Sequence, residues 1–129
     1  MAFATTGAPY YEQLLMQIKQ QIVDGSLRPG DKLPSIRAMA MEMHLNPNTV
    51  SKTYQLLESQ QAVYTVKGRG TFVNTPTKTM INPIAVAEMQ TKLETALTEA
   101  RFLGVTEEQV QAWVTKAYRT GEQADEHQS

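Results

Sequence analysis

The sequence predicts a mainly α-helical fold that carries one small β-hairpin and ends in two further helices. Apolar residues recur at intervals of three and four over most of the chain, which is typical of amphipathic helices. One short β-forming stretch is divided by Lys67-Gly68-Arg69-Gly70, a glycine-containing loop typical of a hairpin. The length of 129 residues and the 41% hydrophobic content suit one globular domain with a small appendage.

Residues 10–24 are predicted to form the first helix. Leu14, Ile18, Ile22 and Val23 recur at helical spacing, so we expect these side chains to face the core. A proline precedes the pattern and a glycine follows it, which are common start and stop signals. The next segment contains a proline–glycine turn and is predicted to be a loop.

Two short helices joined by a tight turn are predicted next. Ser35 is expected to cap a helix that runs to about Met43. Either Asn46 or Asn48 is expected to cap the following helix, which runs to about Ser59. The inward face of that helix has residues spaced three and four apart: Val50, Thr53 and Leu57, with Tyr54 partly covering them. Its outward residues are all able to form hydrogen bonds: Asn48, Ser51, Lys52 and Gln55.

A hairpin and a linker follow. Residues 62–66 and 71–74 are rich in β-forming side chains, and residues 67–70 supply the glycines that a tight hairpin loop needs. Threonine alternates with proline and lysine over residues 75–79, a composition that predicts a linker. The first domain is therefore expected to cover residues 1–74.

Residues 80–120 are predicted to hold two helices, one starting near Pro83 and one after a capping box that begins at Thr106. About 35 helical residues cannot bury a sufficient core alone, so their apolar stripes must pack on the N-terminal domain or on a second chain. Large aromatic side chains here could line a ligand pocket, but an interface between copies is favoured. The expected dimerisation residues are Leu93, Leu97, Trp113, Val114 and Tyr118. Residues 121–129 are polar and expected to be disordered.

The charge is unevenly distributed along the chain. The formal net charge is −1, which argues against nonspecific binding of nucleic acid. Residues 1–74 hold seven basic and five acidic residues, a net of +2, whereas residues 75–129 hold five basic and eight acidic residues, a net of −3. A polyanionic partner would therefore bind the N-terminal half.

The sequence lacks the residues that several classes of function need. There are no cysteines, which excludes disulfides, thiolate zinc sites and cysteine nucleophiles. His44 and His127 have no partners at ligand spacing, so we expect no metal site. No nucleophile elbow or phosphate loop is present, and we expect neither an enzyme nor a cofactor. We also expect a cytoplasmic protein, because no secretory signal and no apolar run of about 18 residues occurs.

The third helix and the hairpin together favour binding to double-stranded DNA. A major groove admits one helix, and short polar side chains at its N-terminal end can read base edges or hold phosphates. A glycine loop with two cations is a poor core element but fits a minor groove, for which Arg69 is the best candidate. The alternative is a protein-interaction module without specific DNA binding, in which the polar face is a docking surface. Lys67 and Arg69 around glycines favour DNA over that alternative.

Residues 10–73 resemble the winged helix–turn–helix of the GntR family of bacterial transcription regulators. The matching segments are Gly25-Ser26-Leu27-Arg28-Pro29-Gly30-Asp31-Lys32-Leu33-Pro34-Ser35, Ile36-Arg37, Asn48-Thr49-Val50 and Gly68-Arg69-Gly70-Thr71-Phe72-Val73. The short C-terminal segment and Asn46-Pro47-Asn48-Thr49-Val50 are similar to the YtrA subfamily. That resemblance implies a homodimeric repressor of a palindromic operator, with an ABC transporter in the target operon. It identifies no effector ligand.

The resemblance also implies a set of DNA contacts. A basic residue early in the second helix commonly binds DNA in this family, and Arg37 occupies that position. The family often has arginines where this chain has Pro47 and Ser51, so we expect amide and hydroxyl contacts here. The expected DNA-binding residues are Ser35, Arg37, Asn46, Asn48, Thr49, Ser51, Lys52, Tyr54, Lys67, Gly68, Arg69 and Gly70.

Overall fold

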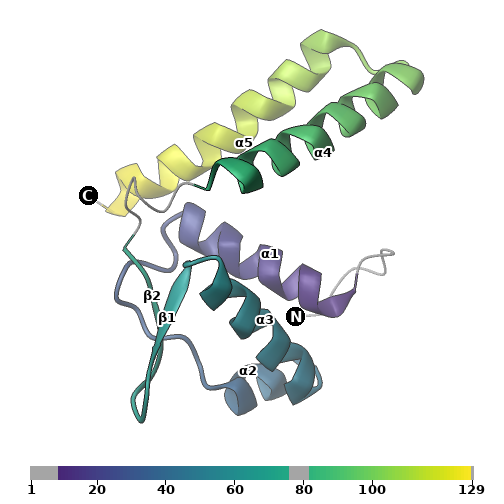
Figure 1. Ribbon diagram of the computed structural model, residues 1–129. Coiled ribbons are helices and arrows are strands. Elements are labelled where there is room, and N and C mark those ends of the chain that lie inside the picture. Colours follow the sequence, from purple (N-terminus) through teal and green to yellow (C-terminus); the bar gives the residue numbers. More distant parts are fainter. Residues whose placement is uncertain (1–8, 76–81, 129) are drawn as a thin grey trace. The chain divides into compact units, whose positions relative to one another are not determined.

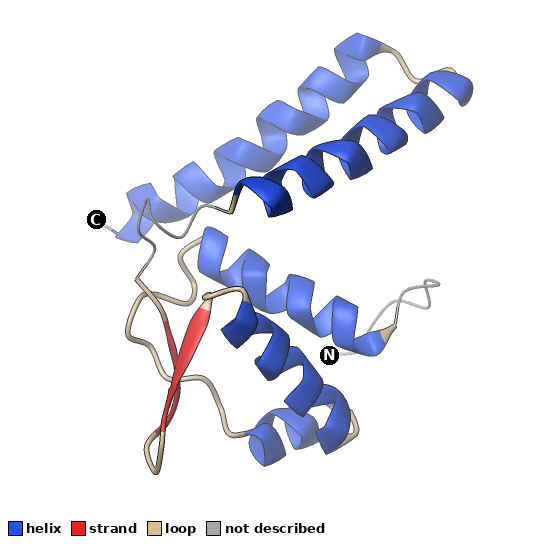
Figure 2. Ribbon diagram, viewed as in Figure 1, coloured by secondary structure: helices blue, strands red, loops and turns tan. Residues whose placement is uncertain are grey.

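The computed structural model describes residues 9–75 and 82–128, with side chains up to Arg119. Over these residues the chain forms five helices and one antiparallel hairpin, and it divides into two compact units between Pro76 and Thr77. Most of the expected linker lies outside the described residues. Figure 1 labels the elements and Figure 2 separates helices from strands. Their bounds are α1 (Tyr10–Val23), α2 (Ile36–Met43), α3 (Pro47–Ser59), β1 (Val63–Val66), β2 (Gly70–Val73), α4 (Pro83–Phe102) and α5 (Glu107–Gln128).

The first unit is built around α3, which contacts α1, α2 and β1. Leu14 and Ile18 of α1 are fully buried against it, as their spacing predicts. Val50, Thr53 and Leu57 of α3 are likewise completely buried. Because α3 buries its apolar stripe on three neighbours, its opposite, polar face is held outward.

The turn between α2 and α3 is set by local signals. Ser35 caps α2 through its Oγ, which accepts a hydrogen bond from the Ala38 N–H at 3.0 Å. His44 ends that helix in the left-handed region, at φ 56°. Asn46 caps α3, since its Oδ1 accepts from the Asn48 N–H at 2.8 Å. This geometry decides between the two predicted caps in favour of Asn46.

The hairpin is hydrogen-bonded through β2 to the loop before α2. β1 and β2 pair antiparallel, with Val63 opposite Val73 and Val66 opposite Gly70. The Leu33 N–H donates to the Thr71 carbonyl at 2.8 Å, and Lys32 forms a bridge with Phe72. The loop before α2 therefore acts as a third, short strand beside β2.

The direction of the Val23 side chain and the end of α5 differ from what the sequence predicts. Val23 does not face the core but is 69% exposed, because it lies about 100° around the helix from Ile22. The helix α5 continues to Gln128, beyond the expected end of the last helix near residue 120. Residues 121–128 include glutamate, glutamine and one alanine, which are good helix formers, and adding residues to an existing helix is easier than starting one.

The second unit consists of α4 and α5, joined by a turn over residues 103–106. Asn82 caps α4 by accepting from the backbone N–H groups of Ile84 and Ala85. Thr106 and Gln109 form the expected capping box before α5. Although every residue of α4 is described, none is buried. Large apolar side chains of this unit are about half exposed or more: Ile84, Val86, Met89, Leu93, Phe102, Leu103, Trp113, Val114 and Tyr118.

Candidate nucleic-acid interface

The outward face of α3 presents short polar side chains near its N-terminal end. Asn46, Asn48 and Lys52 are exposed, and Thr49 and Ser51 are partly exposed. The Ser51 hydroxyl accepts a weak hydrogen bond of 3.4 Å from the Gln55 amide. These groups can donate or accept hydrogen bonds, as base edges require. Asn46 uses its side-chain oxygen for the cap, so only its amide N–H₂ is available to a partner.

The wing, defined here as residues 63–73, carries its cations at an exposed tip. Lys67, Gly68 and Arg69 are exposed, and the Arg69 N–H closes the turn on the Val66 carbonyl at 2.9 Å. Gly68 and Gly70 have φ of 78° and 127°, which L side chains rarely adopt. The glycines thus allow a narrow loop whose side chains are mainly the two cations.

An open hollow of about 400 Å³ lies between the wing and the start of α2. Lys32 lines this hollow together with Lys67 and Arg69. Ser35, Gly68 and Gly70 are among its other lining residues, so the structure brings these predicted residues together. Arg37, Asn46 and Ser51 line neither this hollow nor the one described below, although Arg37 is exposed on α2.

Lys32 was absent from the expected DNA-binding set. A Cβ placed on Gly70 would lie 2.7 Å from the Lys32 Cε, so the lysine stem runs directly over this glycine. The position results from the bridge between Lys32 and Phe72, which joins residues 40 apart in sequence. The spacing of residues within the loop does not predict that Lys32 pairs with Phe72. The sequence signals for Lys32 were the excess of basic residues in the N-terminal half and its place within residues 25–35, a segment that carries the family resemblance.

Tyr54, one of the expected DNA-binding residues, lines the hollow beside the wing but is nearly buried. Its side chain is only 6% exposed, and its hydroxyl donates to the Pro34 carbonyl at 2.7 Å. Burial, reinforced by the charge of Glu42, raises the pKa of Tyr54 to about 12. Tyr54 therefore links α3 to the loop before α2 by a hydrogen bond, and it packs beneath the surface that these two segments form.

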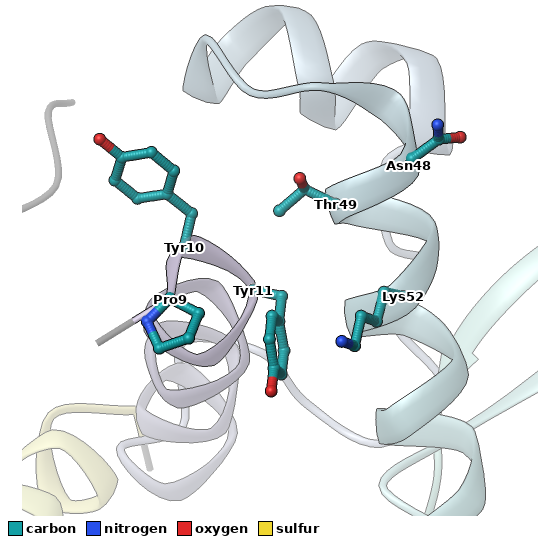
Figure 3. Close-up of a pocket in the computed structure, with 6 residues that line it drawn as sticks. All are labelled: Pro9, Tyr10, Tyr11, Asn48, Thr49 and Lys52. Carbon is teal, nitrogen blue, oxygen red and sulfur yellow. The ribbon is translucent and has the colours of Figure 1, made fainter. Parts of the chain in front are cut away.

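A second hollow, of about 380 Å³, lies between the starts of α1 and α3. Its lining residues are Pro9, Tyr10, Tyr11, Asn48, Thr49 and Lys52. Figure 3 shows Lys52 directed toward the Tyr11 ring, whereas Asn48 is directed away from α1. The Lys52 Nζ lies 3.9 Å from the centroid of that ring, a cation–π contact.

A family model described as "Bacterial regulatory proteins, gntR family" matches residues 10–73, half of the chain. This chain belongs to the GntR family. The matched segment is the unit built around α3 and the wing, so the GntR resemblance seen in the sequence motifs is confirmed. The mainly α-helical winged helix–turn–helix with two C-terminal helices is confirmed as well.

Relatives of this GntR protein extend the match into the second unit. The chain is 36% identical over 109 residues to the HTH-type transcriptional repressor YtrA of Bacillus subtilis, covering 84% of both chains. It is 40% identical, with a TM-score of 0.83, to a crystal structure described as a transcriptional antiterminator from Listeria monocytogenes EGD-e. That match covers 88% of this chain and 85% of the other. The similarity to YtrA confirms the subfamily resemblance.

A DNA complex is also among the similar structures. The DNA-binding domain of AraR bound to the operator ORX1 is 27% identical, with a TM-score of 0.53, over 57% of this chain and 94% of that one. With the family match, this supports a plain statement of function: the chain is a DNA-binding transcription regulator. Within the described residues no helix is long and apolar enough to cross a membrane, and no three histidine or acidic side chains are grouped to hold a metal ion.

Proposed function

We propose that this GntR protein is a cytoplasmic repressor that binds a palindromic operator as a homodimer. The main support is the arrangement of α3, whose apolar face is completely buried while its polar face stays outward near a cationic wing. A helix so fixed can enter a major groove while the wing reaches the neighbouring minor groove. YtrA of Bacillus subtilis, similar over 84% of its length, is itself named a repressor.

The proposed contacts divide by chemistry. Asn48 is suited to an adenine edge, because an amide offers a donor and an acceptor together. Thr49 and Ser51 supply hydroxyls, and Asn46 its amide donor. Arg69 would enter the minor groove. Backbone phosphates would be bound by the remaining groups at the start of α2 and in the wing: the cations Lys32, Arg37 and Lys67 by charge, and Ser35 and the glycine N–H groups of the tip by hydrogen bonds.

The second unit supports the proposal of a homodimer. Leu93 and Val114 are about half exposed, Trp113 is 57% exposed and Tyr118 is 77% exposed. Leu97 is partly buried. Two helices with so much apolar surface in water need a partner, and a second copy offers the same surface around a two-fold axis. The two α3 helices would then meet successive major grooves about 34 Å apart.

The target is proposed from the YtrA resemblance alone. We propose that the operator controls an operon that includes an ABC transporter. The identity of the neighbouring genes is the direct check of this point.

The decisive experiment is binding to the protein's own promoter. A labelled promoter fragment and a random duplex of equal length would be titrated at several salt concentrations, followed by footprinting. We expect tighter binding to the promoter at physiological salt and protection of two half-sites on one face of the duplex. Equal affinity for both duplexes would reject sequence-specific regulation, and a single protected half-site would reject the dimer.

A further inference from the structure

One cation of the proposed interface is held by an aromatic ring that belongs to another helix. The Lys52 Nζ lies 3.9 Å from the Tyr11 ring centroid, well within the range of about 6 Å over which such contacts stabilise an ammonium. Tyr11 lies in the first turn of α1 and is not among the expected DNA-binding residues. The contact therefore joins α1 to the exposed part of α3 (Figure 3).

The backbone that carries the ring is held independently of the lysine. The Thr53 hydroxyl is fully buried and lies 3.2 Å from the Tyr11 carbonyl and 3.1 Å from the Thr49 carbonyl. This hydrogen bonding ties the backbone of α1 at Tyr11 to the buried side of α3. A substitution of the Tyr11 ring leaves the backbone tie in place, so the function of the ring can be tested separately.

A ring beneath the ammonium changes what Lys52 can do on binding. A free lysine samples many rotamers and must lose that freedom when it makes a contact. The ring holds the ammonium from one side by electrostatic attraction to its face. The N–H groups on the other side remain able to donate to an incoming anion.

The direction of Lys52 indicates which part of DNA it meets. Figure 3 shows the lysine drawn back toward α1, whereas Asn48 is directed away from α1. If Asn48 faces base edges, Lys52 faces the flank of the groove, where the backbone runs. The hollow of about 380 Å³ beside it has no acidic residue in its lining. An anion can therefore approach Lys52 there without repulsion from a lining carboxylate.

We propose that Tyr11 is a positioning residue that presets Lys52 to bind a backbone phosphate of DNA beside the major groove. The proposal rests on the proposed function of DNA binding. It assigns Lys52 to affinity and not to base reading, and it extends the interface to the first turn of α1.

The test is a double-mutant cycle with Tyr11→Leu, Lys52→Met and the double variant, and with Tyr11→Phe as the matched control. Each full-length protein is titrated with the promoter fragment and the random duplex at several salt concentrations. Lys52→Met keeps an unbranched chain over the ring and removes the charge. Lys52→Met should weaken binding to both duplexes and reduce the salt slope by about 1.

The Tyr11 variants should separate the ring from the hydroxyl. We expect Tyr11→Phe to bind like the wild type, because the ring face is retained. Tyr11→Leu should weaken binding to both duplexes by about two- to five-fold, the size of the cost of ordering Lys52 that the ring removes. In the Lys52→Met background, Tyr11→Leu should have no further effect. An equal loss in both backgrounds, or no loss at all, overturns the proposal, as does a Lys52→Met effect confined to the promoter.

A measurement on the free protein distinguishes failure of this inference from failure of the proposed function. In the free protein, NMR should show the Lys52 side-chain protons shifted upfield by the Tyr11 ring in the wild type and in Tyr11→Phe, but not in Tyr11→Leu. Absence of that shift overturns the proposal even if DNA binds. If the shift is present and the wild type binds neither duplex, the proposed function has failed and this inference fails with it. Thermal unfolding of Tyr11→Leu confirms that the variant is folded.

Discussion

Asn48 and Arg69 occupy different kinds of surface, and their proposed roles differ accordingly. Asn48 stands on a regular helix whose other face is buried, so its amide is held at a defined position on the surface. Arg69 sits at an exposed glycine-flanked tip, where a long flexible cation can follow the shape and potential of a groove. Specificity is therefore expected from the helix, and affinity from the wing.

Alanine substitutions at these two positions should separate the two effects. Asn48→Ala is expected to reduce the preference for promoter over random DNA by about 1–3 kcal/mol, the value of one bidentate base contact. Arg69→Ala should weaken binding to both duplexes and lower the salt slope by about 1. Competition titrations measure both quantities. Equal losses on the two duplexes for both variants would contradict this division.

Tyr54 should act on stability and its pH dependence. Tyr54→Phe removes the 2.7 Å hydrogen bond to the Pro34 carbonyl, for which we expect a loss of about 1 kcal/mol in the free energy of unfolding. The raised pKa of Tyr54, about 12, means that the folded state favours the neutral phenol. The contribution of Tyr54 to the free energy of unfolding is full below the ordinary tyrosine pKa of about 10 and falls as pH rises toward 12.

Urea unfolding of the wild type and of Tyr54→Phe from pH 8 to pH 11.5 measures this effect. The stability difference between the two proteins should shrink above about pH 10. The other four tyrosines are common to both proteins, so their titration cancels in the difference. A difference that stays constant over this range would show that Tyr54 titrates normally.

At the scale of single elements, the start of α3 holds both the helix cap and residues of the proposed DNA-binding surface. The Asn46 side chain both ends the turn and begins the helix that carries Asn48, so loss of the cap should disturb the binding face indirectly. Pro47 at the first helical position sets the same start, because proline is preorganised there. Where the family often has an arginine, this chain thus has a proline that makes the start of α3 rigid.

The two functions of Asn46 can be separated by a pair of substitutions. Asn46→Ala should lower the free energy of unfolding by about 1 kcal/mol, because the cap is lost. Asn46→Asp keeps a capping oxygen and should retain stability, but its negative charge next to DNA should weaken binding to any duplex. Chemical unfolding and DNA titration of both variants provide the check. If Asn46→Asp binds DNA as tightly as the wild type, Asn46 does not lie at the interface.

At the scale of the whole molecule, we propose that the exposed apolar surface of α4 and α5 drives the assembly of two copies. Trp113, Leu93 and Tyr118 are each half exposed or more within this chain, which is unfavourable for such large side chains in water. Two linked DNA-binding units also bind a two-site operator far more tightly than one unit does, because the second contact becomes intramolecular.

Charged substitutions in this surface should therefore produce monomers. Leu93→Asp and Trp113→Asp are each expected to shift the protein from dimer to monomer in analytical ultracentrifugation. Operator affinity should fall by about a hundredfold or more, while binding to a single half-site is retained. Thr95→Asp, an exposed position about 200° around α4 from Leu93, is the matched control and should remain dimeric. A wild-type monomer would refute this part of the proposal.

Local signals were sufficient for much of the fold. The caps at Ser35 and Asn46, the glycines of the wing and the buried spacing of α1 and α3 all depend on residues within a few positions of one another. Tyr54 borders the polar and apolar faces of α3, and only its contact with Pro34, 20 residues away, decides its direction. The continuation of α5 over residues 121–128 was not predicted, because their polar composition carries no apolar helical periodicity.

The sequence by itself determined the family, the order of helices and strands, and the polar face of α3, because these follow from short-range periodicity, capping and turn chemistry. Only the tertiary structure placed Lys32 beside the wing, Tyr54 inside the unit and Tyr11 beneath Lys52. Each of those placements joins segments 20 or more residues apart, through hydrogen bonds or contacts that leave no periodic trace in the chain. The surface that meets DNA is therefore specified locally on α3, and its supports are specified by packing.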